Sequence, residues 1–326
     1  MLSGITVTCF AASYAVALLL EISRLFFQSG VRAAVLIGFM VAGLFAHTWF
    51  LGMQVVAGAP GGAPLASWFD WFLIAAWVLV VVYLYLAAYH PKNPIGLFLL
   101  PVVLGLIGVA YLFDDRPFPV NRASQVWGTV HGVSLLLGTV VVILGFIAGV
   151  MYLVQSYRLK HKLPPSDRFK LPSLEWLETT INRSIAISTL LLAAGVLSGV
   201  ILNVAIRVGR GASGLGWNDP VVWTSGLLFG WLMAAWIFSA LYRPARQGRK
   251  VAYLTFATFG FLVLTLAVVL WAPSDHPASV QVNAECGVRN AELIATLTPH
   301  SAFPIPHLRE ASFSNSISVD PLGGSV

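Results

Sequence analysis

The residues best suited to chemistry are three histidines and one short tryptophan-bearing stretch. Residues 214–223 read GLGWNDPVVW and lie between two long apolar runs. His131, in VWGTVHG, and His276, in APSDHP, lie at ends of apolar segments, and His47, in LFAHTWFL, lies within one. Neutral imidazole is a common axial ligand of haem iron, and two imidazoles complete a six-coordinate site. These residues therefore raise the possibility of iron-porphyrin binding.

Aromatic and basic side chains accompany the histidines. Indole rings offer flat apolar surface to a porphyrin, and guanidinium groups can pair with its propionates. The candidates are Trp127, Trp217, Trp223, Arg122, Arg207 and Arg210. Other interpretations stay open, because tryptophans mark the aromatic belt of any membrane protein. A helix-end histidine is often a structural hydrogen-bonder, and an isolated intramembrane histidine pairs with a backbone or hydroxyl group at least as often as with a metal.

The elements that must position these residues are membrane helices. The chain has 326 residues, of which 58% are hydrophobic and only 10% charged, whereas soluble domains carry about 25% charged residues. A membrane-spanning helix needs about 20 mostly apolar residues. The sequence therefore predicts an all-α, polytopic integral membrane protein with eight transmembrane helices, near residues 3–21, 33–56, 67–89, 94–113, 128–154, 184–206, 221–242 and 251–271.

The first of these segments is interpreted as a retained helix. No Lys or Arg precedes Glu21, so the basic region of a signal peptide is missing. The chain is expected to form a membrane domain over residues 1–272 and a loosely ordered outward tail over residues 273–326, with one short strand near 279–284. Pro172 and Ser173 before LEWLETTI predict a short amphipathic helix at the inner interface that leads into the sixth segment. Leu174, Leu177 and Ile181 fall on one face of it, which is expected to contact lipid headgroups.

Basic residues set the expected topology. Of the 19 Lys and Arg residues, 13 fall in alternate connections and the other 6 in the remaining connections and the tail. The positive-inside rule then places the basic loops in the cytoplasm and both termini outside, in the inner (cytoplasmic) membrane. This bias accounts for most of the net charge of +6, so no nucleic acid partner is expected. The lipid bilayer is the expected surrounding.

Cysteine and glycine spacing adds two expectations. Cys9 and Cys286 are the only cysteines, which excludes a disulfide framework, a zinc set of cysteines and a CxxCH haem-attachment site. Small-xxx-small spacings occur in the fifth, sixth and seventh segments, at Gly145/Gly149, Gly195/Gly199 and Gly226/Gly230. Such spacing allows close helix approach in lipid, so these three helices are expected to form the tight part of the bundle.

Five ordered stretches between about residues 35 and 272 resemble one family. They are LFAHTWFL; APLASWFDWFLIAAWVLVVVYL with NPIGLFLLP; VWGTVHGVSLLLGTVVVILGFIAGVMYLVQSYRLKHK; LPSLEWLETTINRSIAISTLLLAAGVLSGV; and WNDPVVW with RQGRKVAYLTFATFGFLVL. In this order they are similar to the integral-membrane cytochrome c assembly proteins of the CcmC/CcsA type, and most to their HemX-like branch.

The resemblance implies a use for the opening stretch. In that family an outward Trp-rich loop, the WWD motif, lies between two outward histidines and holds haem b, transiently and non-covalently, for delivery to apocytochrome c. By position, His131 and His276 would be the two axial ligands. The remainder of the motif would be Trp217, Asp219, Pro220 and Trp223, with Asp219 orienting the loop or a ligand. A CcsB-like or other cytochrome c maturation subunit is the implied partner.

Two departures from the family pattern bear on this expectation. The family loop reads roughly WGxxWxWDP, whereas this chain reads RGASGLGWNDP, with Asn218 between Trp217 and Asp219. Residues 221–242 also lack the intramembrane histidine that many synthase members carry. A platform with fewer rings offers porphyrin less apolar contact.

Two hypotheses follow, with a third disfavoured. The first is a non-enzymatic haem-handling protein of cytochrome c biogenesis, alone or within a haem lyase complex. The second is a HemX-like membrane scaffold or regulator of the haem pathway that binds no haem, which the thinned loop favours. A small-molecule permease is disfavoured because charged residues are nearly absent from the apolar segments and no paired broken helices are found.

Overall fold

The structure is a computed structural model. It describes residues 6–26, 30–57, 67–89, 93–113, 125–162, 171–210, 216–241 and 249–271. The chain divides into two units, Met1–Glu285 and Cys286–Val326, and all described residues belong to the first. The predicted tail 273–326, its strand near 279–284 and His276 lie outside the described residues.

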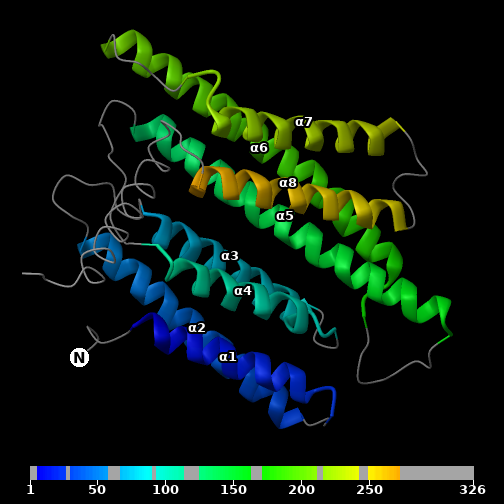
Figure 1. Cartoon of the computed structure of the whole chain (residues 1–326). Helices are drawn as coiled ribbons and strands as arrows, with labels where there is room; N and C mark the ends of the chain where they lie inside the picture. Colours follow the sequence, from blue (N-terminus) through cyan, green and yellow to red (C-terminus); the bar gives the residue numbers. More distant parts are fainter. Residues whose placement is uncertain are drawn as a thin grey trace, which may run out of the picture. The chain divides into compact units, whose positions relative to one another are not determined.

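All regular structure in the described residues is helical (Figure 1). The helices are α1 (Val7–Ser23), α2 (Gly30–Ala57), α3 (Trp68–Tyr89), α4 (Gly96–Ala110), α5 (Gln125–Lys160), α6 (Leu174–Arg210), α7 (Pro220–Leu241) and α8 (Arg249–Trp271). The sequence therefore predicted the all-α class and the place of each helix correctly. The ends differ by a few residues except in α5 and α6, which are longer than predicted.

The short interfacial helix predicted to lead into the sixth segment is present as the first part of α6 and does not lie on a lipid surface. Residues 174–182 are the first turns of α6, which runs without a break for 37 residues. No glycine or proline occurs between Leu174 and Ala194, so nothing in this stretch ends the helix. Leu177 and Ile181 are fully buried within the protein, whereas the prediction had placed their face against lipid.

Six of the eight helices are long and apolar enough to cross a membrane: α2, α3, α5, α6, α7 and α8. The other two, α1 and α4, have 17 and 15 residues. At 1.5 Å per residue they are about 26 Å and 23 Å long, against a hydrocarbon core of about 30 Å. The length criterion therefore supports six of the eight predicted spans.

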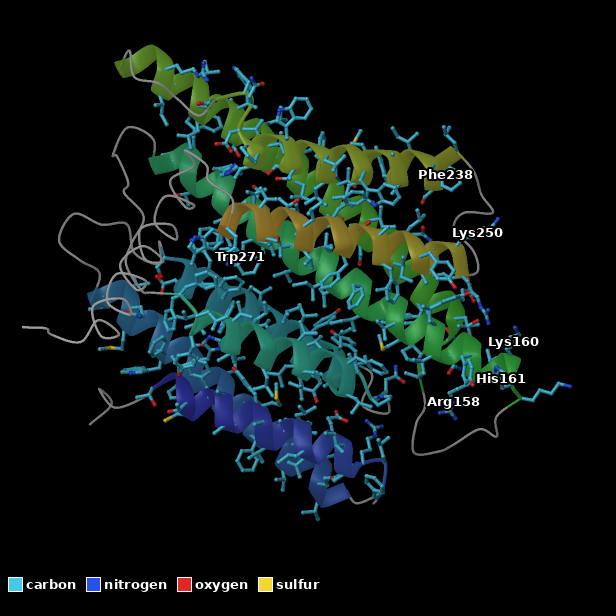
Figure 2. All side chains as sticks on the ribbon, in the orientation of Figure 1. Arg158, Lys160, His161, Phe238, Lys250 and Trp271 are labelled. Carbon is cyan, nitrogen blue, oxygen red and sulfur yellow. The ribbon has the colours of Figure 1, made fainter. Side chains whose placement is uncertain are left out.

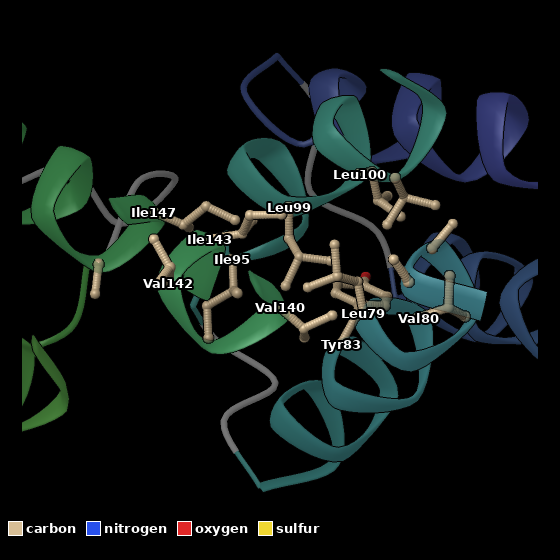
Figure 3. Close-up of a cluster of buried hydrophobic side chains, with 14 of the residues drawn as sticks. Leu79, Val80, Tyr83, Ile95, Leu99, Leu100, Val140, Val142, Ile143 and Ile147 are labelled. Carbon is tan, nitrogen blue, oxygen red and sulfur yellow. The ribbon is translucent and has the colours of Figure 1, made fainter. Parts of the chain in front are cut away.

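Consecutive helices pack into two rings of four. In the first ring, α1 contacts α2, α2 contacts α3, α3 contacts α4, and α4 returns to α1. The second ring closes in the same way through α5, α6, α7 and α8. Helix α5 joins the two rings because it also contacts α3 and α4. Figure 3 shows the apolar cluster at this junction, with Leu99 of α4 beside Val140 and Ile143 of α5.

Contacts near the helix ends define two ends of the bundle. At one end, which we call the basic end, Arg249 donates from Nε to Ser156 Oγ at 3.1 Å. Figure 2 shows Arg158, Lys160 and Lys250 at this end and Trp271 at the opposite end of α8. The opposite end, where residues 216–219 join α6 to α7, is called the loop end. Basic side chains therefore gather at one end, as the alternating loop charges predict.

A buried carboxylate holds the first ring together. Glu21 of α1 is 5% exposed, and its Oε1 accepts a hydrogen bond of 3.0 Å from the Tyr83 hydroxyl of α3. Its Oε2 lies 3.8 Å from the Arg24 guanidinium. A Cβ at Gly96, the first residue of α4, would lie 2.9 Å from Glu21 Oε1 and 2.8 Å from the Tyr83 ring. Three helices therefore meet around one carboxylate, and a side chain at position 96 would separate them.

Glycine spacing identifies the tight contacts only in part. A Cβ at Gly145 would lie 3.0 Å from Ser184 of α6, and one at Gly149 would lie 2.6 Å from Thr255 Oγ1 of α8. In α7, by contrast, a Cβ at Gly226 or Gly230 would meet nothing within 4 Å. The prediction is confirmed for α5 and α6 and wrong for α7, whose glycines face outward.

Substitution of Gly149 tests the close contact of α5 with α8. In Gly149→Ala the new methyl group displaces Thr255, whose hydroxyl donates to the Ala252 carbonyl at 2.7 Å. Overpacking of this kind costs about 1–3 kcal/mol, which exceeds the gain of about 1 kcal/mol in helix propensity. We expect a lower free energy of unfolding, measured by denaturant titration in detergent. Gly230→Ala, with open space around it, is the control, and an equal response of both variants contradicts the contact.

Candidate functional site

His131 lies in the second turn of α5 and is held by α6. Its Nδ1 is 2.7 Å from the Gly195 carbonyl oxygen. A carbonyl oxygen only accepts, so Nδ1 carries the proton of this hydrogen bond. In the neutral ring the lone pair is then on Nε2, for which no hydrogen-bond partner is found among the described residues. This is the tautomer in which a histidine ligates a metal through Nε2.

The ring of His131 fills a gap that a glycine leaves open. A Cβ at Gly199, one turn beyond Gly195 on α6, would lie 2.8 Å from both Cε1 and Nδ1 of the imidazole. On the next residue of α5, a Cβ at Gly132 would lie 2.5 Å from the Trp71 ring of α3. Helix α5 is therefore in close contact with α6 and α3 at the level of His131, which fixes the position of the imidazole.

The WNDP stretch forms the start of α7. Asp219 is 8% exposed, and its Oδ1 accepts a hydrogen bond of 2.8 Å from the Val221 amide. Its carbonyl accepts from the amides of Val222 and Trp223 at 3.0 and 3.2 Å. An aspartate before the helix and a proline at the first helical position are typical of helix N-termini. Asp219 and Pro220 therefore both stabilise the start of α7.

The two tryptophans of this stretch are exposed. Trp217 is 53% exposed and Trp223 is 68% exposed, so both indoles lie on the surface at the loop end. The Arg207 guanidinium carbon is 5.8 Å from the centre of the Trp217 ring, within the range of a cation–π interaction. One face of the Trp217 indole is therefore next to the Arg207 guanidinium. Arg210 ends α6, but its side chain, like all of Arg122, lies outside the described residues.

The sequence predicted that His131 and the loop share one end of the bundle, and the structure agrees. Arg207, which contacts the loop, is eight residues beyond Gly199 on α6, a rise of about 12 Å. Trp127 lies four residues before His131, on the same face of α5, and is 42% exposed. His131 is therefore set about two helical turns below the loop, with Trp127 between these levels. The predicted second imidazole, His276, lies outside the described residues.

His47 has a different setting, in the first ring. It is fully buried and stacks on Phe10 of α1, with ring centroids 4.1 Å apart and an interplanar angle of 3°. Its Nδ1 is 3.3 Å from the Tyr14 hydroxyl. The structure thus gives His47 a hydroxyl partner within an α1–α2 aromatic cluster, and it does not bring His47 to the loop.

Several residues near the site were not singled out from the sequence. Gly195 and Gly199 were interpreted only as generic small-xxx-small spacing. In the structure, the His131 ring lies against both residues, which are one helical turn apart. Trp271, the last residue of α8, is 69% exposed and lies at the loop end (Figure 2). In α8, Thr265 donates to the Thr224 carbonyl of α7 at 3.3 Å, which brings the final turns of α8 to this end. Within the described ranges, no group of three or more His, Cys, Asp or Glu side chains could hold a metal ion.

The fold and site define a polytopic helical membrane protein. Below its tryptophan-bearing turn lies a histidine, His131, whose Nε2 lone pair has no hydrogen-bond partner among the described residues. The family model described as Cytochrome C assembly protein matches residues 65–274, from just before α3 to just after α8. The chain therefore belongs to the cytochrome c assembly protein family. Membership indicates a role in cytochrome c biogenesis. Comparisons with curated proteins and with solved structures gave no match.

The extent of the family match separates the candidate residues into two groups. His131, Trp217, Asp219 and Trp223 lie within residues 65–274. His47 does not, because α1 and α2 precede the matched range, and His276 lies just beyond its end. Residue contacts and family range thus agree in separating His47 from His131 and the loop residues.

Removal of the helix cap tests the structural part of the loop. Asp219→Ala deprives the Val221 amide of its acceptor, and loss of an N-cap costs about 0.5–2 kcal/mol. We expect a lower thermal midpoint in detergent and a shift in tryptophan fluorescence from Trp217 and Trp223. Asp219→Asn keeps an acceptor oxygen and is the matched control. If Asp219→Ala unfolds like the wild type, Asp219 does not stabilise the start of α7.

Proposed function

We propose that this protein holds haem b at the loop end of its membrane domain, with His131 as an axial ligand, for delivery to apocytochrome c. The observation that carries the proposal is the hydrogen bond from His131 Nδ1 to the Gly195 carbonyl. It leaves the Nε2 lone pair of a neutral imidazole for iron. A histidine that needed Nδ1 for coordination would not be committed to a backbone carbonyl in this way.

Haem is the cargo in this proposal, and the side chains around His131 bind and orient it. Trp127 supplies an indole one turn from His131, and Trp217 and Trp223 supply exposed indoles at the end of the bundle. Arg207 can leave the Trp217 ring to pair with a propionate, an exchange of a cation–π contact for a charge-assisted hydrogen bond. Arg210 is a second candidate for this pairing. His276 is proposed as the opposite axial ligand on the basis of its place in the family pattern.

The covalent attachment of haem takes place between haem and a cysteine of apocytochrome c. Thioether formation adds a cysteine sulfur to a haem vinyl carbon, and the thiol proton goes to the neighbouring vinyl carbon. No oxidant or reductant is consumed in this addition, and the chain needs no catalytic residue of its own for it. Its residues hold the porphyrin at the membrane surface. Apocytochrome c and a CcsB-like or other cytochrome c maturation subunit are the proposed partners.

We further propose that all eight helices cross the inner membrane, with both termini and the loop end outside. The support is the collection of basic side chains at the opposite end, which the positive-inside rule assigns to the cytoplasm. Helices α1 and α4 are short for the hydrocarbon core, but each packs against the other within the first ring. A short span is accommodated by local thinning of the bilayer at modest cost.

Thiol labelling tests this orientation. In a chain carrying Cys9→Ser and Cys286→Ser, single cysteines are introduced as Asn218→Cys at the loop end and His161→Cys at the basic end. A membrane-impermeant maleimide added to intact spheroplasts is expected to label Asn218→Cys, and to label His161→Cys only after lysis. Labelling of the two positions in the opposite order refutes the proposed topology.

A second candidate function is a HemX-like scaffold or regulator of the haem pathway that binds no haem. The observation in its favour is that residues 216–223 carry only two tryptophans and that three of the four motif residues have a structural use. Asp219 caps α7, Pro220 begins it, and Trp217 contacts Arg207. A loop that serves only to connect α6 to α7 would keep these same residues.

Absorption spectroscopy separates the two functions. Protein purified from haem-sufficient membranes is expected to show a Soret band, which His131→Ala removes or shifts and His276→Ala changes to that of a singly ligated iron. His161→Ala, at the basic end, is the matched control and should leave the spectrum as in the wild type. A colourless, stably folded wild-type protein that also takes up no added haem supports the scaffold function.

A further inference from the structure

We infer that Gly195 and Gly199 of α6 are positioning residues for His131: together they select its Nδ1–H tautomer and fix its ring, so that Nε2 is the nitrogen presented to iron. The inference rests on the proposed haem-binding function and assigns to α6 a part that the loop and the histidines do not supply. Two contacts carry it, one polar and one steric.

The polar contact selects the tautomer. The bond of 2.7 Å from His131 Nδ1 to the Gly195 oxygen is short for an N–H donor. The hydroxyl of Ser198, a buried residue, lies 2.9 Å from the same carbonyl oxygen and 2.7 Å from that of Ala194, and it shares its one proton between them. A carbonyl oxygen has no hydrogen to donate, so the alternative Nε2–H tautomer would place the Nδ1 lone pair against a lone pair of this oxygen. In metal sites a histidine is commonly held in this way by a backbone carbonyl, which also raises the basicity of the ligating nitrogen.

The steric contact fixes the ring. Cε1 and Nδ1 of His131 lie 2.8 Å from the position that a Cβ of Gly199 would occupy. Real Cβ atoms do not approach ring atoms this closely, so any side chain at position 199 moves the imidazole or separates α5 from α6. A Cβ at Gly195 would similarly lie 2.6 Å from Leu135 Cδ2, one turn further along α5. The two glycines thus allow the backbone of α6 to reach the imidazole.

The spacing of four residues between Gly195 and Gly199 lets both of them contact the His131 ring. Gly195 and Gly199 lie on one face of α6, separated by about 6 Å along the axis. This separation places the carbonyl of one residue and the open Cα of the other beside a single imidazole. The α7 pair Gly226/Gly230 has the same spacing but meets nothing within 4 Å, so it provides an internal comparison.

The test begins with the haem-free protein, so that it does not depend on haem binding. In protein labelled with ¹⁵N-histidine, the His131 signals are those lost in His131→Gln. The inference expects the shifts of a protonated Nδ1 and an unprotonated Nε2 in the wild type. A His131 with its proton on Nε2 overturns the inference, whatever the protein does with haem.

Substitution then tests the steric contact. In Gly199→Ala we expect a mixture of His131 tautomers and a haem affinity lower by about tenfold or more, in line with the loss of outer-shell support at metal sites. Gly226→Ala is the matched control, with one methyl group added to an open helical glycine, and should retain both wild-type properties. A Gly199→Ala protein that folds and keeps a pure Nδ1–H tautomer and full haem affinity overturns the steric part.

The outcomes separate this inference from the proposed function. If the wild-type protein holds the Nδ1–H tautomer and Gly199→Ala loses it, the inference that Gly195 and Gly199 position His131 is supported. If that same wild-type protein takes up no added haem, the proposed haem function fails, but the positioning of His131 by Gly195 and Gly199 stands. Should Gly199→Ala fail to fold, the tautomer of the wild-type protein decides the inference alone.

Discussion

The close approach of α5 to α6 is the contact on which the rest of the site depends. Between helices in lipid there is little hydrophobic driving force, so close contact, hydrogen bonds and small residues must supply the association. Here the small residues are Gly145 on α5 and Gly195 and Gly199 on α6. They bring the two backbones near enough for a side chain of one helix to bond a carbonyl of the other. His131 uses that carbonyl, and the position of its imidazole follows from the helix contact.

Helix α5 both carries His131 and joins the two rings of helices. Its face toward α6 carries His131, and its other contacts, with α3 and α4, join the rings through an apolar cluster that includes Val140 and Ile143 (Figure 3). Trp71 of α3 contacts α5 at Gly132, the residue after His131. The histidine therefore lies where both rings restrain the same turn of one helix. This accounts for a polar residue that is held firmly although it is close to a helix end.

The sequence predicted the parts of this structure that depend on local composition. Apolar runs marked all eight helices, the alternating charges marked the two ends, and VWGTVHG placed His131 near the start of its helix. It did not reveal which carbonyl His131 contacts, because that depends on the register of α5 against α6. It also did not show that α6 is continuous from Leu174, since a run of Leu and Ile beside Glu suits a lipid surface and a protein interior equally. The outward glycines of α7 failed the packing prediction for the same reason, because spacing does not say which face meets a neighbour.

The carboxylate of Glu21 has a consequence for how the chain is made. Its hydrogen-bond donor, the Tyr83 hydroxyl, is 62 residues further along the chain, and Gly96, which makes room for it, is later still. When α1 and α2 have left the ribosome, neither partner exists, and the basic neighbours of Glu21 within this hairpin are Arg24 and Arg32. A charged group is costly in hydrocarbon. The contact of Glu21 with α3 and α4 can therefore form only after both of these helices have been synthesised, so completion of the first ring is tied to translation in time.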